Sequence, residues 1–198
     1  MTAAEPFADN PADAAFDLTI QPDGWLPLQA GVLHHPSPNH DQRPNSEDPY
    51  LLVIHNISLP PGVFQGDAII DFFQNRLDLS ADPWFENIRD LRVSAHFLIR
   101  RDGVIVQFVP TLLRAWHAGI SSFEGRERCN DFSIGIELEG TDTLAYTDAQ
   151  YARLGALAAA IRVRHPIRAV QGHEHIAPGR KTDPGLAFDW KRFGQGQN

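Results

Sequence analysis

The sequence contains little cysteine and no excess of basic residues. Cys129 is the single cysteine among 198 residues, so an intramolecular disulfide is excluded, which suits a compartment that keeps thiols reduced. The formal net charge of -8 argues against a nucleic-acid partner, because phosphates need a basic surface. No segment approaches the roughly 18 apolar residues of a membrane helix, so we expect no membrane partner.

The first residues lack the features of a secretory signal. The segment MTAAEPFADNPADAAFD has neither a basic start nor an apolar core, so we expect a cytoplasmic protein. It is rich in Ala, Asp and Pro and has no periodicity, which predicts a mobile extension over residues 1–17. The remainder, residues 18–198, has the length and composition of a single domain.

Apolar periodicity predicts a mixed α/β domain, with a mixed central sheet flanked by helices. Residues 51–54 form a continuous apolar run typical of a buried strand, and residues 94–110 form a hairpin pattern. Residues 132–139 alternate, which places Glu137 and Glu139 on one face of a strand. Helical spacing is found over residues 66–79 and after the capping-box pattern that begins at Thr147, whereas residues 82–90 are predicted to be a loop.

The segment GHEHIAPGRKTDPG, residues 172–185, is of a type that is usually a loop, and it carries His173, Lys181 and Asp183. Imidazole and carboxylate are ordinary zinc ligands, and an ammonium group can stabilise an oxyanion. A catalytic zinc site needs a third ligand, for which His55 at the end of the strand 51–54 is the best candidate. Taken alone, His55 is better explained as a histidine that only makes hydrogen bonds at a strand end, and the metal role depends on the other residues.

Three further assignments stay open at this level. If residues 173–175 are extended, His173 and His175 could bind one metal together; otherwise His173 acts alone with Asp183. Glu137 is either a general base on a central strand or a solvated residue on an edge strand. Trp116 forms either the wall of a sugar or peptide site or part of the core. No HExxH motif is present.

Several motifs together resemble one family. The strings LLVIHNISLPPG, RVSAHFLIRRDG, RAWHAG, GRERCNDFSIGIELEGTDT and IAPGRKTDPG are similar to the AmpD-type amidases, which are cytoplasmic zinc N-acetylmuramoyl-L-alanine amidases of peptidoglycan recycling. The resemblance runs from about residue 24 to residue 190 and implies the fold shared by phage-lysozyme-type amidases and peptidoglycan recognition proteins. It implies one Zn²⁺ per chain on His55, His173 and Asp183, with Glu137 as general base or acid and Lys181 as the oxyanion partner.

The resemblance also implies residues that bind the substrate, an anhydro-muropeptide. They are Asn56, Arg92, Ala115 (through its backbone), Trp116 and Arg128. The implied reaction cleaves the amide between the lactyl group of 1,6-anhydro-N-acetylmuramic acid and L-alanine, and we expect a monomer.

Two other functions are conceivable on the same fold. One is a non-catalytic muropeptide-binding module, which typically lacks a metal ligand; the other is an amidase that acts on intact wall outside the cytoplasm. The chain departs from the family in one place, because His175 replaces the usual aspartate.

Overall fold

The computed structural model describes residues 18–64 and 66–195, so the predicted extension over residues 1–17 lies outside the described residues. A six-stranded sheet runs through the middle of the domain, with the strand order β1-β5-β4-β9-β3-β10. Its strands are β1 (Val32–His34), β3 (Leu51–Ile57), β4 (Phe97–Ile99), β5 (Ile105–Gln107), β9 (Ser133–Glu139) and β10 (Ala169–Gly172). The β4–β5 hairpin is antiparallel and the other neighbours are parallel, which confirms the predicted mixed sheet.

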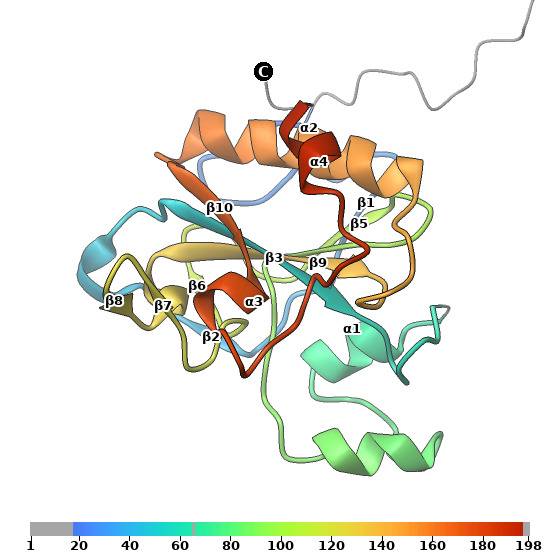
Figure 1. The fold of residues 1–198 in the computed structure, drawn as a ribbon. Coiled ribbons are helices and arrows are strands. Elements are labelled where there is room, and N and C mark those ends of the chain that lie inside the picture. The colour runs from blue at the N-terminus through green and yellow to red at the C-terminus, as the bar shows by residue number, and fades with distance from the viewer. Residues whose placement is uncertain (1–17, 65, 196–198) are drawn as a thin grey trace, which may run out of the picture.

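Helices α2 (Asp148–Arg164) and α4 (Trp190–Gln195) lie over one side of this sheet (Figure 1). The N-terminus of α2 has the predicted capping box, in which the Thr147 hydroxyl accepts from the Gln150 backbone N–H and the Gln150 side chain accepts from the Thr147 backbone N–H. Leu154, Leu157 and Ile161 are fully buried against strand residues such as Ile136. This apolar layer packs against the interior strands β4, β9 and β3.

The opposite side is covered only in part, by α1 (Ala68–Phe73) and the 3-10 helix η3 (Pro83–Ile88) (Figure 1). The helix predicted over residues 66–79 is too long, because Gln74 ends it and Asn75 has a positive φ. The loop predicted over residues 82–90 is also wrong: the Asp82 carboxylate accepts from the Trp84 N–H and starts η3. Among the described residues, no helix is long and apolar enough to cross a bilayer.

Several short elements surround the remaining part of that face. Two small antiparallel pairs join β2 (His40–Asp41) to β6 (Arg114–Ala115) and β7 (Ser122–Phe123) to β8 (Arg126–Glu127). Helix α3 (His173–Ile176) follows β10 directly, so the segment expected to be a loop begins with a short helix. Two 3-10 turns, η2 (Pro44–Ser46) and η4 (Cys129–Asp131), complete the regular structure of residues 18–64 and 66–195.

Candidate metal centre

Two imidazoles and one carboxylate meet at the carboxyl ends of β3 and β10. The strands are parallel and pair Gly172 with Ile54, so the residues that follow these two, His173 and His55, are neighbours. Their Nδ1 atoms are 3.0 Å apart. Asp183 Oδ2 lies 2.9 Å from Nδ1 of His55 and 3.0 Å from Nδ1 of His173. The three residues predicted as metal ligands are therefore brought together.

The donor atoms of this cluster fit a zinc ion. Zinc bonds of about 2.0–2.2 Å at tetrahedral angles place ligand atoms about 3.3 Å apart, close to the spacing found here. The Ala118 carbonyl oxygen lies 3.0 Å from His173 Nε2 and the Arg180 guanidinium lies 3.3 Å from it, so an acceptor and a donor both face this nitrogen. When the ring hydrogen is on Nε2, the Nδ1 lone pair faces the Asp183 carboxylate and is free to bind a cation.

The electrostatics of the cluster favour the ligating forms. Burial lowers the pKa of His55 to about 4, against the opposing effect of Asp183, so its imidazole is neutral at neutral pH. Burial alone would raise the pKa of Asp183, but hydrogen bonds from His173 and His55 outweigh it and hold the pKa below its ordinary range. Neutral imidazole and ionised carboxylate are the forms that bind metal.

Glu137 lies beside this cluster on the central strand β9. It is paired in register with His55 on β3, so the two side chains leave the sheet on the same face. The side chain is buried, and its Oε2 has no hydrogen-bond partner within the described part of the chain. Burial raises the pKa of Glu137 well above its ordinary value; the Asp183 charge adds to this and the Lys181 ammonium opposes it. The central position excludes a solvated edge strand, and such a carboxyl group can accept and return a proton.

Two clefts of about 590 and 550 Å³ flank the cluster and share Arg180 and Lys181. Asn56, Asp183 and Trp84 line the first cleft. The second cleft is lined by Arg92, Trp116, His117 and His173, among others. Lys181 is exposed and forms a wall of both clefts, which places its charge beside the cluster.

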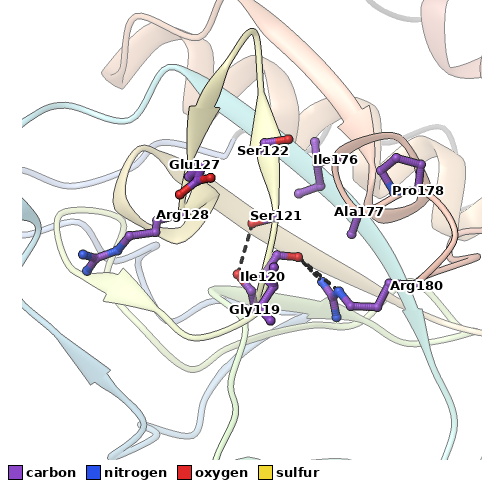
Figure 2. A pocket seen from close by; sticks show the side chains of 10 residues that line it. All are labelled: Gly119, Ile120, Ser121, Ser122, Glu127, Arg128, Ile176, Ala177, Pro178 and Arg180. Atoms are coloured by element: carbon purple, nitrogen blue, oxygen red, sulfur yellow. Dashed lines mark hydrogen bonds between the residues drawn. The ribbon is translucent and has the colours of Figure 1, made fainter.

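A third pocket, of about 500 Å³, continues from the second through their common residues Gly119 and Arg180 (Figure 2). Arg128 lies on one side of it, and the Arg180 guanidinium donates to the Ile120 carbonyl on the other. The Arg128 side chain is 69% exposed, and its Nε lies 3.4 Å from the Asp131 carboxylate. Arg92 and Arg128 thus line adjoining pockets rather than one.

The remaining residues predicted to bind substrate have different surroundings. The Asn56 amide nitrogen donates to Asp142 Oδ1 and to the Pro184 carbonyl, and Asn56 lines the first cleft. Trp116 lines the second cleft, as one of the two predicted alternatives requires. Ala115 is buried in β6, paired with His40, and its side chain lines none of the three pockets described above.

The structure gives His175 a local role. Its Nδ1 accepts from the Gly172 backbone N–H at 2.9 Å, which caps the first turn of α3. An aspartate at this position could accept the same hydrogen, so the replacement preserves the cap. Because His173 begins that turn and His175 points back to Gly172, the helical backbone separates the two histidines, and His173 alone joins the cluster.

Sequence reasoning missed two neighbours of the ligands. His117 Nδ1 lies 2.9 Å from His55 Nε2, and the Arg180 guanidinium lies 2.7 Å from the Ala118 carbonyl oxygen that pairs with His173. The motif RAWHAG contains His117 but gives no sign of its partner. A contact between residues separated by 62 positions depends on tertiary packing alone.

Comparison with known proteins agrees with this geometry. The family profile described as N-acetylmuramoyl-L-alanine amidase matches residues 45–186. The 1,6-anhydro-N-acetylmuramyl-L-alanine amidase AmpD of Citrobacter freundii is 61% identical over 173 residues, which cover 86% of this chain and 91% of that protein. AmpD of Escherichia coli (strain K12) is 60% identical over 172 residues, with 86% and 92% covered.

Solved structures show the same similarity. The crystal structure of a selenomethionine derivative of AmpD superposes with a TM-score of 0.85 at 59% identity, covering 89% of this chain and 98% of the other. The amidase AmiD from E. coli, in complex with the substrate anhydro-N-acetylmuramic acid-L-Ala-D-γ-Glu-L-Lys, gives a TM-score of 0.55 at 31% identity, with 78% and 60% covered. The similarity therefore extends over the cluster and its clefts.

Proposed function

Because this chain belongs to the N-acetylmuramoyl-L-alanine amidase family, we propose that it is a zinc enzyme that releases the peptide from 1,6-anhydro-N-acetylmuramyl peptides. The scissile bond is the amide between the lactyl group of the sugar and L-alanine. The observation that supports the proposal is that ligand atoms of His55, His173 and Asp183 lie close enough together to bind one zinc ion. The buried carboxyl group of Glu137 lies beside them. A binding module without activity is not favoured, since no member of this set is missing.

His55, His173 and Asp183 would hold the zinc ion. When bound there, zinc supplies a water of near-neutral pKa and polarises the scissile carbonyl. Glu137 accepts a proton from the attacking water and returns it to the nitrogen of L-alanine as the C–N bond breaks. The hydroxyl oxygen stays on the lactyl carbon, so the products are the free sugar acid and a peptide with an amino terminus. Lys181 stabilises the charge that develops on the carbonyl oxygen.

The clefts suggest how the substrate lies across the cluster. Arg92 in the second cleft and Arg128 in the third pocket present cations to the carboxylates of the peptide stem. The first cleft then remains for the sugar, with Asn56 at its edge and Trp84 in its wall. Trp116 is in the second cleft, on the peptide side. We propose that the backbone at Ala115, the residue before it, also contacts the peptide.

We also propose that the enzyme works as a monomer in the cytoplasm. Its single cysteine is a free, buried thiol, which suits a reducing compartment. Sedimentation of the purified protein tests the oligomeric state, and fractionation of cells tests the compartment.

The central experiment combines metal analysis with identification of products. The purified protein should contain one zinc per chain and convert an anhydro-muropeptide into anhydro-N-acetylmuramic acid and a peptide that begins with L-alanine, as read by mass spectrometry. Chelation should stop the reaction, and added zinc should restore it. A zinc-replete protein that leaves the lactyl amide intact would contradict the proposal.

A further inference from the structure

Three buried side chains form a hydrogen-bond chain that begins at Nε2 of His55, the ring nitrogen that does not face Asp183. His55 Nε2 lies 2.9 Å from His117 Nδ1, and His117 Nε2 lies 3.2 Å from Ser133 Oγ. His55 is on β3 and Ser133 on β9, whereas His117 follows β6. All three side chains are at most 9% exposed, so their polar atoms depend on one another for hydrogen bonds.

The His117 ring is held in place from two sides. Gly135 lies against one side, where a Cβ atom would come within 2.4 Å of the ring, so only glycine leaves room for the imidazole. The backbone N–H groups of His117 and Ala118 both donate to Asn130 Oδ1, at 3.1 and 2.8 Å, which fixes the turn that carries the ring. The ring nitrogens therefore stay in line with His55 and Ser133.

Each member of this chain can both donate and accept a hydrogen bond, so the chain has two possible directions. In one direction His55 Nδ1–H donates to Asp183, His117 Nδ1–H donates to His55, and the Ser133 hydroxyl donates to His117. In the other, His55 Nε2–H donates to His117 and His117 Nε2–H donates to Ser133. Only the second direction leaves a lone pair on His55 Nδ1.

The other imidazole ligand has different neighbours. Its Nε2 lies 3.0 Å from the Ala118 carbonyl oxygen, which accepts, and 3.3 Å from the Arg180 guanidinium, which donates. The two ligating histidines thus differ: Nε2 of His55 faces another imidazole, that of His117, whereas Nε2 of His173 faces a backbone oxygen and an arginine side chain.

We propose that His117 is a positioning residue that sets the metal-binding tautomer of His55, and that metal uptake reverses the hydrogen bonds from His55 to Ser133. The inference rests on the proposed function for the identity of the ligands. In both directions each imidazole carries one hydrogen and the serine keeps its own. On metal uptake the proton that leaves His55 Nδ1 passes to water and water returns one to Ser133 Oγ, so there is no net proton exchange with solvent. In both directions Nε2 of His55 and the two nitrogens of His117 stay hydrogen-bonded, with or without the ion.

A neighbouring histidine provides a matched comparison. His96 is also fully buried, and its ring centroid lies 5.7 Å from that of His117. Its Nδ1 accepts from the Gly135 N–H and its Nε2 lies 3.1 Å from the Leu113 carbonyl oxygen, so both nitrogens are occupied away from the cluster. A change at His96 disturbs the same region, including the edge of the His117 ring, without removing a hydrogen bond of the chain that begins at His55.

The first test reads the tautomers directly in the wild-type protein. Long-range ¹H–¹⁵N correlation spectra of the imidazole rings should show His55 and His117 protonated at Nδ1 without metal and at Nε2 with one equivalent of zinc. His173 should be protonated at Nε2 once zinc is bound. A His117 ring that keeps the same tautomer on zinc loading overturns the inference while leaving the proposed function intact. Failure to bind zinc at these residues overturns both, and metal analysis identifies that case.

The second test measures zinc affinity by competition with a chromophoric chelator. His117→Phe should raise the zinc Kd by about 10–100-fold, the usual effect of losing the partner of a ligating histidine. His117→Asn should recover most of the affinity, because the amide oxygen lies near the position of Nδ1 and still accepts from His55. His96→Phe should lower the thermal stability but leave the Kd within about threefold. Equal losses in His117→Phe and His96→Phe, or no recovery in His117→Asn, would reduce His117 to a packing residue.

Discussion

Replacement of Glu137 by glutamine tests the chemistry at the site most directly. The substitution keeps the shape of the side chain and removes its ability to carry a proton from water to the leaving nitrogen. General acid–base catalysis contributes about 10²–10⁴-fold. At 1.36 kcal/mol for each factor of ten, the activation free energy should rise by about 2.7–5.4 kcal/mol. Zinc content should stay at one per chain, because Glu137 is not among the three ligand residues.

The same substitution should stabilise the metal-free fold. Burial and the nearby Asp183 raise the pKa of Glu137, so the folded state holds the proton more tightly than the unfolded chain does. This contribution to stability is fully present below the unfolded pKa and is lost as the pH rises through the folded pKa. Glutamine carries no charge at any pH. Glu137→Gln should therefore have the higher Tm at neutral to alkaline pH in the presence of a chelator, by about 2–4 °C for each kcal/mol gained.

Glu139 is the matched control for this experiment. It lies two residues further along β9 on the same face, is also buried, and also has a raised pKa because of burial. Its Oε2, however, accepts from the Arg101 backbone N–H at 2.9 Å, so this carboxyl group has a structural partner that Glu137 lacks. Glu139→Gln can keep that bond through its amide oxygen and should leave kcat unchanged.

The measurements are zinc content, turnover of an anhydro-muropeptide by chromatography and mass spectrometry, and Tm in chelator. The assignment of Glu137 fails if Glu137→Gln retains kcat within threefold of the wild type while it holds zinc. It also fails if zinc and turnover disappear together, because Glu137 would then act as a ligand.

Three further outcomes are expected. Asp183→Ala should lose zinc and turnover together, since two imidazoles alone do not close the site; an active variant without metal would contradict the ligand assignment. Arg92→Ala or Arg128→Ala should raise KM by about 10-fold with little effect on kcat or Tm, and the loss should vanish for substrates whose stem carboxylates are amidated. Burial lowers the pKa of His96 and of His165 in the folded state. Their neutral forms therefore contribute stability above the unfolded pKa near 6.5. This stability is lost as the pH falls from there through the folded pKa values. Urea unfolding in chelator should show this as a free energy of unfolding that falls by up to about 1.4 kcal/mol per pH unit for each histidine, and a flat profile between pH 7.5 and 5.5 would exclude it.

The sequence by itself determined the parts of this protein that depend on neighbouring residues. The apolar run that becomes β3, the β4–β5 hairpin and the alternation in β9 are local patterns, and the structure confirms each of them. The capping box at Thr147 is equally local, because its two hydrogen bonds join residues three positions apart. The motifs around His55 and residues 172–185 also indicated the family, which the comparisons confirm.

Only the tertiary structure decided which of these residues meet. His55 and His173 are separated by 118 positions, and their contact follows from the parallel pairing of β3 with β10. Alternation placed Glu137 and Glu139 on one face, but the register with β3 sets Glu137 beside His55, while Glu139 pairs with the Arg101 backbone. The contact between His117 and His55 arises in the same way. A hydrogen bond between distant segments depends on sheet register and on close packing, here against Gly135, and local sequence patterns predict neither of these.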